Sequence, residues 1–332
     1  MLGLQPPSVP RLEWEVQNSG VTARLRGLSA VSPQVAWASG ANGTVLRTVD
    51  GGINWQLRPV TGASTLDFRD VDAMSDHVAY VLSIGPGEAS RIFKTNDGGA
   101  HWDLQFQDKG PAVFLDAMAF WDADRGVAVG DSVRGALYIL TTTNGGRTWT
   151  RLDTAPLPAA LPNEGAFAAS GTNVAVSGRS DAWIATGASR VLHSTDGGRT
   201  WTVATTPVPS GESSGIFSVA FRDRDHGVVV GGDYRDESAA VSNAAITSDG
   251  GAAWRSSTRG LSGYRSVVAW VPTTTSSYVA AGPSGVDWSV DDGRTWTSIS
   301  VAGVDTVSFA PRARIGWGAG DRGRLAKLLI RD

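Results

Sequence analysis

Charged residues recur at one position of a repeated pattern in this chain. Seven segments begin with a large hydrophobic residue, and the position after it holds, in chain order, Arg26, Arg69, Asp116, Ala168, Ser218, Arg265 and Asp305. Guanidinium groups donate forked hydrogen bonds that match carboxylates and phosphates. If the seven segments line one channel, the three arginines would form an anion-binding patch flanked by the aspartates. The alternative interpretation is a ring of solvated charges that pair with one another.

The elements that must position these charges are marked by a turn motif that occurs six times. It consists of Ser or Thr, any residue, Asp or Asn, two residues that are usually glycines, two variable residues and Trp. Its acid or amide and its tryptophan fall at Asp50 and Trp55, Asp97 and Trp102, Asn144 and Trp149, Asp196 and Trp201, Asp249 and Trp254, and Asp291 and Trp296. Six copies on a structural period indicate architecture rather than a metal loop or a phosphate cradle.

Each residue type in the turn motif has a structural reason. The Asp or Asn side chain bonds the backbone two residues on, and the glycines supply the positive φ of a tight hairpin. The tryptophan has a large apolar body that suits burial between neighbouring sheets. The sixth copy has Asp292 where the others have their first glycine, so we expect its turn to be distorted.

The spacing of the turn motif predicts the fold. Successive motif tryptophans stand 42 to 53 residues apart, with several short strand patterns in each interval, which is typical of a propeller. Residues 315–327 repeat the pattern without a motif after them, whereas residues 12–16 read like the strand that follows a motif. The sequence therefore predicts an all-β, seven-bladed propeller with four-stranded antiparallel blades, closed by the N-terminal strand. Residues 1–332 would form one domain, with residues 1–11 as an extended tail.

Composition excludes several classes of function. The 332 residues include no cysteine, carry a net charge of −3 and contain no block of Lys or Arg, so we expect no thiol chemistry and no nucleic-acid binding. The four histidines show no metal-ligand spacing, and we expect neither a metal nor a cofactor. No apolar run is long enough for a membrane span. We expect a monomer.

Loop lengths indicate where a partner would bind. The segment from Gly232 to Ala244 is far longer than the corresponding hairpins of other repeats and contains Tyr234 and Arg235. These hairpins and the connections between blades should share the face opposite the turn motifs, because the strands alternate in direction. Insertions gathered on one face of a repeat scaffold usually form its binding surface. Tyr234 and Arg235 are therefore a second set of candidate binding residues.

The turn motif resembles the Asp-box, or bacterial neuraminidase repeat. Together with the Gly-rich hairpin and the repeat length, it makes the chain from Trp14 to Leu329 similar to the photosystem II stability/assembly factor-like propellers. The resemblance implies a non-catalytic binding platform with an arginine-rich patch, for which Arg26, Arg69 and Arg265 are the candidates. It also favours export. Met1 to Pro7 lack the features of a signal peptide, which leaves a cytoplasmic location open.

The Asp-box is shared with glycosidases, so an enzyme is the rival hypothesis. A sialidase typically shows Arg-Ile-Pro at its first arginine, but Arg26 is followed by Gly-Leu and Arg91 by Ile-Phe. An inverting glycosidase needs two carboxylates about 6.5–9.5 Å apart, which Asp70, Asp116 or Asp305 could supply. We expect a propeller without catalytic residues that docks a protein or an anionic segment on its loop face and channel mouth. The alternative is a glycoside hydrolase with its site at the same mouth.

Overall fold

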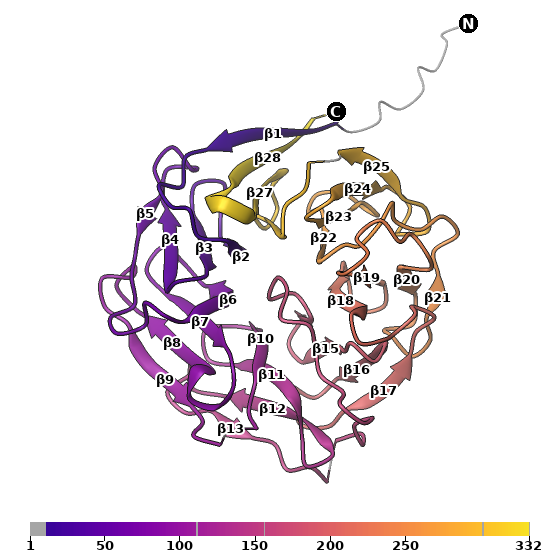
Figure 1. Cartoon of the computed structure of the whole chain (residues 1–332), viewed down its shortest axis with the longest axis horizontal. Coiled ribbons are helices and arrows are strands. Elements are labelled where there is room, and N and C mark those ends of the chain that lie inside the picture. Colours follow the sequence, from indigo (N-terminus) through magenta and orange to yellow (C-terminus); the bar gives the residue numbers. More distant parts are fainter. Residues whose placement is uncertain (1–10, 111, 156, 301, 332) are drawn as a thin grey trace, which may run out of the picture.

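Seven antiparallel sheets of four strands surround a central axis in the computed structural model, which describes residues 11–331 except 111, 156 and 301 (Figure 1). The seven-bladed propeller predicted from the turn motifs is therefore confirmed. Blades one to six are β2–β5, β6–β9, β10–β13, β14–β17, β18–β21 and β22–β25, and blade seven is β26–β28 with β1.

Within each blade the strands run from the axis to the rim. The innermost strands are β2 (Leu25–Ala30), β6 (Asp67–Ala73), β10 (Leu115–Phe120), β14 (Val174–Ser177), β18 (Ser214–Phe221), β22 (Val267–Trp270) and β26 (Thr306–Phe309). The second strands are β3 (Ala36–Gly40), β7 (Ala79–Ile84), β11 (Gly126–Val133), β15 (Asp181–Ala185), β19 (Gly227–Asp233), β23 (Tyr278–Gly282) and β27 (Ile315–Ala319).

The outer half of each of blades one to six carries the turn motif between its two strands, whereas blade seven has no motif because β1 and β28 come from opposite ends of the chain. The third strands are β4 (Thr44–Thr48), β8 (Arg91–Thr95), β12 (Ala136–Thr142), β16 (Arg190–Ser194), β20 (Ala244–Thr247), β24 (Gly285–Ser289) and β28 (Leu325–Arg331). The outermost are β5 (Gln56–Leu57), β9 (Asp103–Gln107), β13 (Thr150–Arg151), β17 (Thr202–Thr205), β21 (Arg255–Ser256), β25 (Thr297–Ser300) and β1 (Arg11–Gln17). We call the face with these turns the motif face. The opposite face, with the hairpins between second and third strands, is the loop face.

Helix is confined to two single turns in the described residues, η1 (Gly87–Ala89) and η2 (Asp321–Gly323). No helix in this part of the chain is long and apolar enough to cross a membrane.

The ring closes through the first described strand. β1 pairs with β28 from Arg11 opposite Arg331 to Gln17 opposite Leu325. Arg11 thus belongs to the strand rather than to the expected tail, whose residues 1–10 lie outside the described residues. The Gln17 side chain accepts the indole N–H of Trp55 at 3.0 Å and that of Trp317 at 3.1 Å. One amide therefore ties the closing blade to blade one.

The hydrophobic core lies between neighbouring blades rather than inside one sheet. Each cluster joins two adjacent blades, and the largest fully buried side chains are the second-strand tryptophans Trp37, Trp183 and Trp317. Among the motif tryptophans, Trp201 and Trp296 are buried, whereas the other four are partly exposed. The motif tryptophans therefore cap the core at the motif face more often than they fill it.

The turn motif forms one conserved hydrogen-bond pattern. In the fourth copy the Ser194 hydroxyl donates to Asp196 Oδ1 at 2.9 Å and accepts the Gly198 N–H at 2.9 Å. Asp196 Oδ1 also accepts the Thr200 N–H at 3.0 Å. Every motif repeats these contacts, which satisfy the backbone donors of the turn.

The expected distortion of the sixth turn is wrong. Asp292 adopts φ +58°, in the region that glycine occupies in the other copies, and the contacts of Ser289 and Asp291 are retained. Aspartate tolerates this backbone region better than most residues. Its carboxylate also receives the Arg222 Nε–H of blade five at 2.7 Å, which compensates for the conformation.

Deleting residues 1–17 should lower the thermal midpoint strongly, because β1, its ladder with β28 and the Gln17 bonds are lost together. Circular dichroism melting measures this. Deleting residues 1–10 is the matched control and should change little, since it leaves β1 intact. Equal melting curves for both deletions would show that β1 does not hold the ring closed.

Replacing the fourth motif's tryptophan should cost more stability than replacing its acid. Trp201→Ala should lower the free energy of unfolding by about 3–5 kcal/mol, because a large buried side chain is removed. Asp196→Ala should cost about 1–2 kcal/mol, as a lost turn bond does. Denaturant unfolding measures both. A stable Asp196→Ala protein that had lost ligand binding would contradict the structural role of the motif.

Candidate functional site

We call the repeated position that follows the leading hydrophobic residue of each innermost segment the column. Three of its five charged residues lie at β-bulges. The register with the second strand shifts between Leu25 and Gly27, between Phe68 and Asp70, and between Leu115 and Ala117. The residues inside the shifts are Arg26, Arg69 and Asp116. A bulge leaves its extra residue outside the ladder and re-aims that side chain. Local strand irregularity therefore turns Arg26 and Arg69 toward the channel.

In blade five the same irregularity falls one residue earlier than the sequence alignment placed it. The shift lies between Ile216 and Ser218, so Phe217 occupies the column in place of Ser218. The alignment matched leading hydrophobic residues, and blade five offers two in succession. The column thus presents an aromatic ring at this point of the channel mouth.

Blade four departs furthest from the predicted layout. Its innermost strand is β14, beginning at Val174, and not the segment that starts at Phe167. Residues 165–173, which precede β14, instead form a loop that reaches into the centre of the ring (Figure 1). We call this segment the central plug.

The central plug bonds to blades on every side of the channel. Its Ala169 and Ala168 carbonyls accept Nη1–H groups from Arg26 at 3.4 Å and Arg69 at 2.7 Å. The Ser170 hydroxyl donates to the Ser266 carbonyl of blade six at 2.7 Å. The plug also reaches blades five and seven through hydroxyl contacts, Thr172 with Ser218 and Thr306 with the Ser170 carbonyl. It therefore fixes the arginine side chains relative to the rest of the ring.

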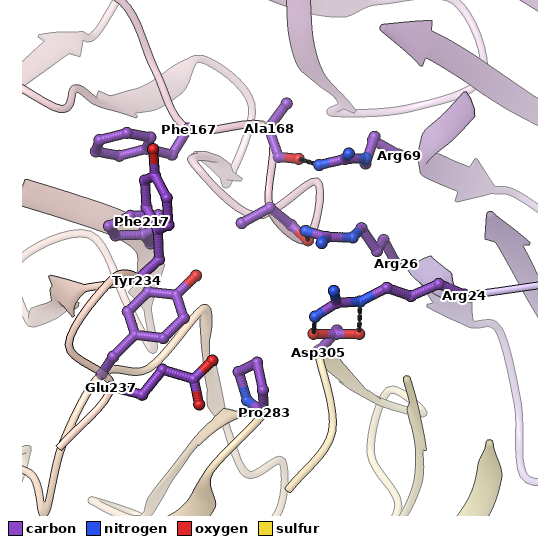
Figure 2. A pocket seen from close by; sticks show the side chains of 12 residues that line it. Arg24, Arg26, Arg69, Phe167, Ala168, Phe217, Tyr234, Glu237, Pro283 and Asp305 are labelled. Carbon is purple, nitrogen blue, oxygen red and sulfur yellow. Dashed lines mark hydrogen bonds and ion pairs between the residues drawn. The ribbon is translucent and has the colours of Figure 1, made fainter. Parts of the chain in front are cut away.

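A pocket of about 270 Å³ opens on the loop face above the plug. Its lining residues are Arg24, Arg26, Arg69, Phe167, Ala168, Ala169, Phe217, Tyr234, Glu237, Tyr264, Pro283 and Asp305. Figure 2 shows the three arginines along one wall and the rings of Phe167, Phe217 and Tyr234 on the other. We call this cavity the channel-mouth pocket.

The aromatic wall is internally packed. Phe167 of the plug stacks on Phe217 with ring centroids 4.0 Å apart, and Tyr264 meets Phe217 edge-on at 4.7 Å. Burial raises the pKa of the Tyr264 phenol, so this side chain stays neutral. The wall offers apolar ring surface with phenol groups at its edge.

The three arginines of the opposite wall differ in how their charge is compensated. Arg24 forms a bidentate ion pair with Asp305, with both N–O distances 2.7 Å, and this hydrogen bonding raises the pKa of Arg24. Arg69 donates from Nε to Asp67 at 2.7 Å. Arg26 pairs with no carboxylate in the described part of the chain and bonds only the Ala169 carbonyl. Burial, and then the charge of Arg69, lower the pKa of Arg26.

Arg26 is therefore the centre of uncompensated positive charge in the pocket. A half-buried guanidinium that lacks an acid keeps free donors for an incoming carboxylate or phosphate. An anion bound there would relieve the repulsion between Arg26 and Arg69.

The expectation that Arg265 joins this cluster is wrong. Its side chain is buried, and its Nε donates to Asp287 Oδ2 at 2.6 Å while its other nitrogens bond the Tyr264 carbonyl and the Ser262 hydroxyl. In blade six the internal acid Asp287 on β24 draws the guanidinium away from the channel. Asp116 does not line the pocket either, because it is fully buried.

The remaining candidates divide between the pocket and its surroundings. Asp305 lines the pocket but is engaged by Arg24, and Tyr234 contributes its ring to the aromatic wall. Arg235 lies over the Tyr234 ring at 5.9 Å and pairs with Glu212 at 2.9 Å, outside the pocket. Sequence reasoning missed Arg24, whose only signal was a position one residue before a leading hydrophobe.

The described residues contain no cluster of three or more His, Asp or Glu side chains arranged to hold a metal ion.

The chain folds as a seven-bladed propeller, and comparison with known proteins supports the resemblance to photosystem II assembly factors found in the sequence. No family model matches the chain. It is similar to photosystem II assembly protein Ycf48 of Synechococcus sp. (strain JA-3-3Ab), with 24% identity over 296 residues, covering 67% of this chain and 86% of that protein. Ycf48 of Synechococcus sp. (strain JA-2-3B'a(2-13)) matches with the same identity and coverage.

Solved structures agree on the fold. YCF48 bound to a D1 peptide superposes with a TM-score of 0.68 and 18% identity, covering 96% of this chain and 97% of that one. YCF48 from Cyanidioschyzon merolae gives a TM-score of 0.68 and 17% identity, covering 95% of this chain and 98% of that one.

Substitution should distinguish the buried, ion-paired Arg265 from the half-buried Arg26 of the pocket. Arg265→Gln should destabilise the protein by about 3–5 kcal/mol, because it leaves the buried Asp287 carboxylate without its partner. Arg26→Gln should change the free energy of unfolding by less than about 1 kcal/mol, since no ion pair is broken. Denaturant unfolding checks both. Equal stability losses would contradict the different roles assigned to these two residues.

Proposed function

We propose that this chain is a binding propeller that docks a protein segment carrying an anionic group in the channel-mouth pocket. The observation that carries the proposal is Arg26, a half-buried guanidinium without a carboxylate partner, flanked by Arg24 and Arg69. The anionic group would bind at Arg26, and the residue beside it would pack on the aromatic wall.

The comparisons support a peptide-like ligand. A structural neighbour with nearly the same extent is YCF48 bound to a D1 peptide, so a propeller of this shape has a peptide as its ligand. A pocket with one basic and one aromatic wall fits a peptide better than it fits a free inorganic anion, because an ion would leave the aromatic surface unused. We infer that the partner is a protein segment with an acidic side chain or a terminal carboxylate.

The glycosidase alternative has weaker support, because one of the two acids that line the pocket is already engaged by an arginine. The acidic groups that line the pocket are Asp305, held by two bonds from Arg24, and Glu237. Asp70 and Asp116, the other candidates for a catalytic pair, are buried away from the pocket, and burial raises the pKa of each carboxyl. A carboxylate whose two oxygens both accept hydrogen bonds from one guanidinium is poorly placed to deliver a proton to a substrate.

Peptide arrays give the direct test. We would screen arrayed twelve-residue peptides, with free or amidated C-termini and with or without acidic residues, and measure the Kd of the best binders by fluorescence anisotropy. Binding of acidic or free-carboxylate peptides should weaken at least tenfold, about 1.4 kcal/mol, in the Arg26→Gln/Arg69→Gln variant. Arg199→Gln, on the motif face, is the matched control and should bind normally.

Two results would contradict the proposed function. Unchanged affinity in the double variant would place the binding site elsewhere. Turnover of chromogenic glycosides that is lost in Asp305→Asn or Glu237→Gln, without any peptide binding, would favour the hydrolase.

A further inference from the structure

A second cavity adjoins the channel-mouth pocket on the loop face. Its volume is about 590 Å³, and Phe167 of the central plug lines both cavities. Half of its lining residues are small, including Gly165, Gly187 and Gly211, so the space suits a long side chain. We call it the acidic cavity, because its charged lining residues are Asp131, Glu164 and Glu212.

Two of these three acids already have cationic partners. Glu164 is buried and pairs with Arg190, whose Nε lies 2.9 Å from Oε1. Burial opposes its ionisation, but the bonds from Arg190 and from the Leu161 N–H outweigh burial and lower the pKa of Glu164. Glu212 is exposed, and its hydrogen bond from Arg235 lowers the pKa of this carboxyl. Both carboxyl groups are therefore charged near pH 7, and each is already paired with an arginine.

Asp131, on β11, lacks such a partner. No Lys, Arg or His side chain of the described residues pairs with it, and burial raises its pKa to about 6. A Cβ on Gly165 would stand 1.7 Å from Asp131 Oδ1, so the plug backbone lies against this carboxylate.

A second acid stands close to Asp131, whose own carboxyl receives a hydrogen bond from the Ala166 backbone N–H. Asp116 is fully buried, and neither of its oxygens has a hydrogen-bond partner. Burial, and then the charge of Asp131, raise the pKa of Asp116 well above its usual range. Asp116 is therefore protonated and neutral near pH 7, and Asp131 is the member of this pair whose charge lacks a cationic partner.

We propose that the acidic cavity binds a lysine or arginine side chain of the same protein segment whose anionic group binds at Arg26. The inference rests on the proposed function and extends it, because it gives the ligand two opposite charges in a fixed order across Phe167. The three arginines line the channel-mouth pocket, Asp131 lines the acidic cavity, and Phe167 lines both. A ligand cation would supply the partner that Asp131 lacks.

The continuity of the two cavities selects a peptide side chain over a free cation. A segment that lies across Phe167 places neighbouring side chains in both cavities, and each attachment raises the local concentration of the other. The described residues also lack the three-ligand cluster that a metal ion would need.

A positional scan of charge tests the inference. Starting from an anionic peptide whose binding depends on Arg26, a single Lys would be placed at each position and compared with Gln at that position. At one or two adjacent positions Lys should bind at least tenfold more tightly than Gln. In Asp131→Asn the ratio of the two Kd values should fall to about one. Asp103→Asn, which changes an exposed acid on β9 outside both cavities, is the matched control and should keep the preference.

The dependence on pH provides a second readout that needs no substitution. Asp131 is charged above its pKa of about 6, so the preference for Lys should be present at pH 8 and lost as the pH falls to 5. Glu164 and Glu212 stay ionised through most of this range because of their lowered pKa values, and Asp116 stays protonated. The Gln peptide controls for every other titration.

Each outcome decides the matter. Arg26-dependent binding without a Lys preference at any position, or with the same preference in Asp131→Asn, would overturn this inference and leave the proposed function standing. Peptide binding that does not depend on Arg26 would overturn both.

Discussion

Each blade of this propeller buries its apolar faces only against its two neighbours, so the structure depends on having no free end. The pairing of β1 with β28 meets that constraint by placing residues from the two ends of the chain in one sheet. Gln17 strengthens the joint, because its single side-chain oxygen accepts from tryptophans of blade one and blade seven. The inter-blade clusters then form a continuous belt in which every blade has a partner on both sides.

The closed ring leaves a central channel, and the central plug blocks it. Because residues 165–173 cross the channel and bond to blades on all sides, the opening on the loop face is a closed pocket rather than a pore. The plug carbonyls hold Arg69 and Arg26, while its Phe167 builds the aromatic wall. One irregular segment thereby contributes to the floor and to both walls of the candidate site.

The fold was predictable because the turn motif depends on local chemistry. A hydroxyl, an acid or amide and glycines at fixed spacing satisfy the turn by themselves, so six copies could be counted and the seventh blade inferred. The site was predictable only in part. Arg26 and Arg265 share a sequence position, yet Asp287 from a neighbouring strand draws one of them inward, and that partner is invisible to a column alignment. The plug was missed because a hydrophobic residue followed by small ones reads as a strand.

The ladder that closes the ring also sets how the molecule would respond to mechanical load. Arg11 and Arg331 are the first pair of the antiparallel ladder between β1 and β28. Strand β1 lies at the rim of the ring (Figure 1). A force that pulls these two residues apart acts on one pair at a time and peels β1 from β28 in sequence. A force applied across the flat faces meets all seven inter-blade cores at once. The propeller should therefore open at low force when β1 is pulled away from β28, and should resist a force applied along its axis.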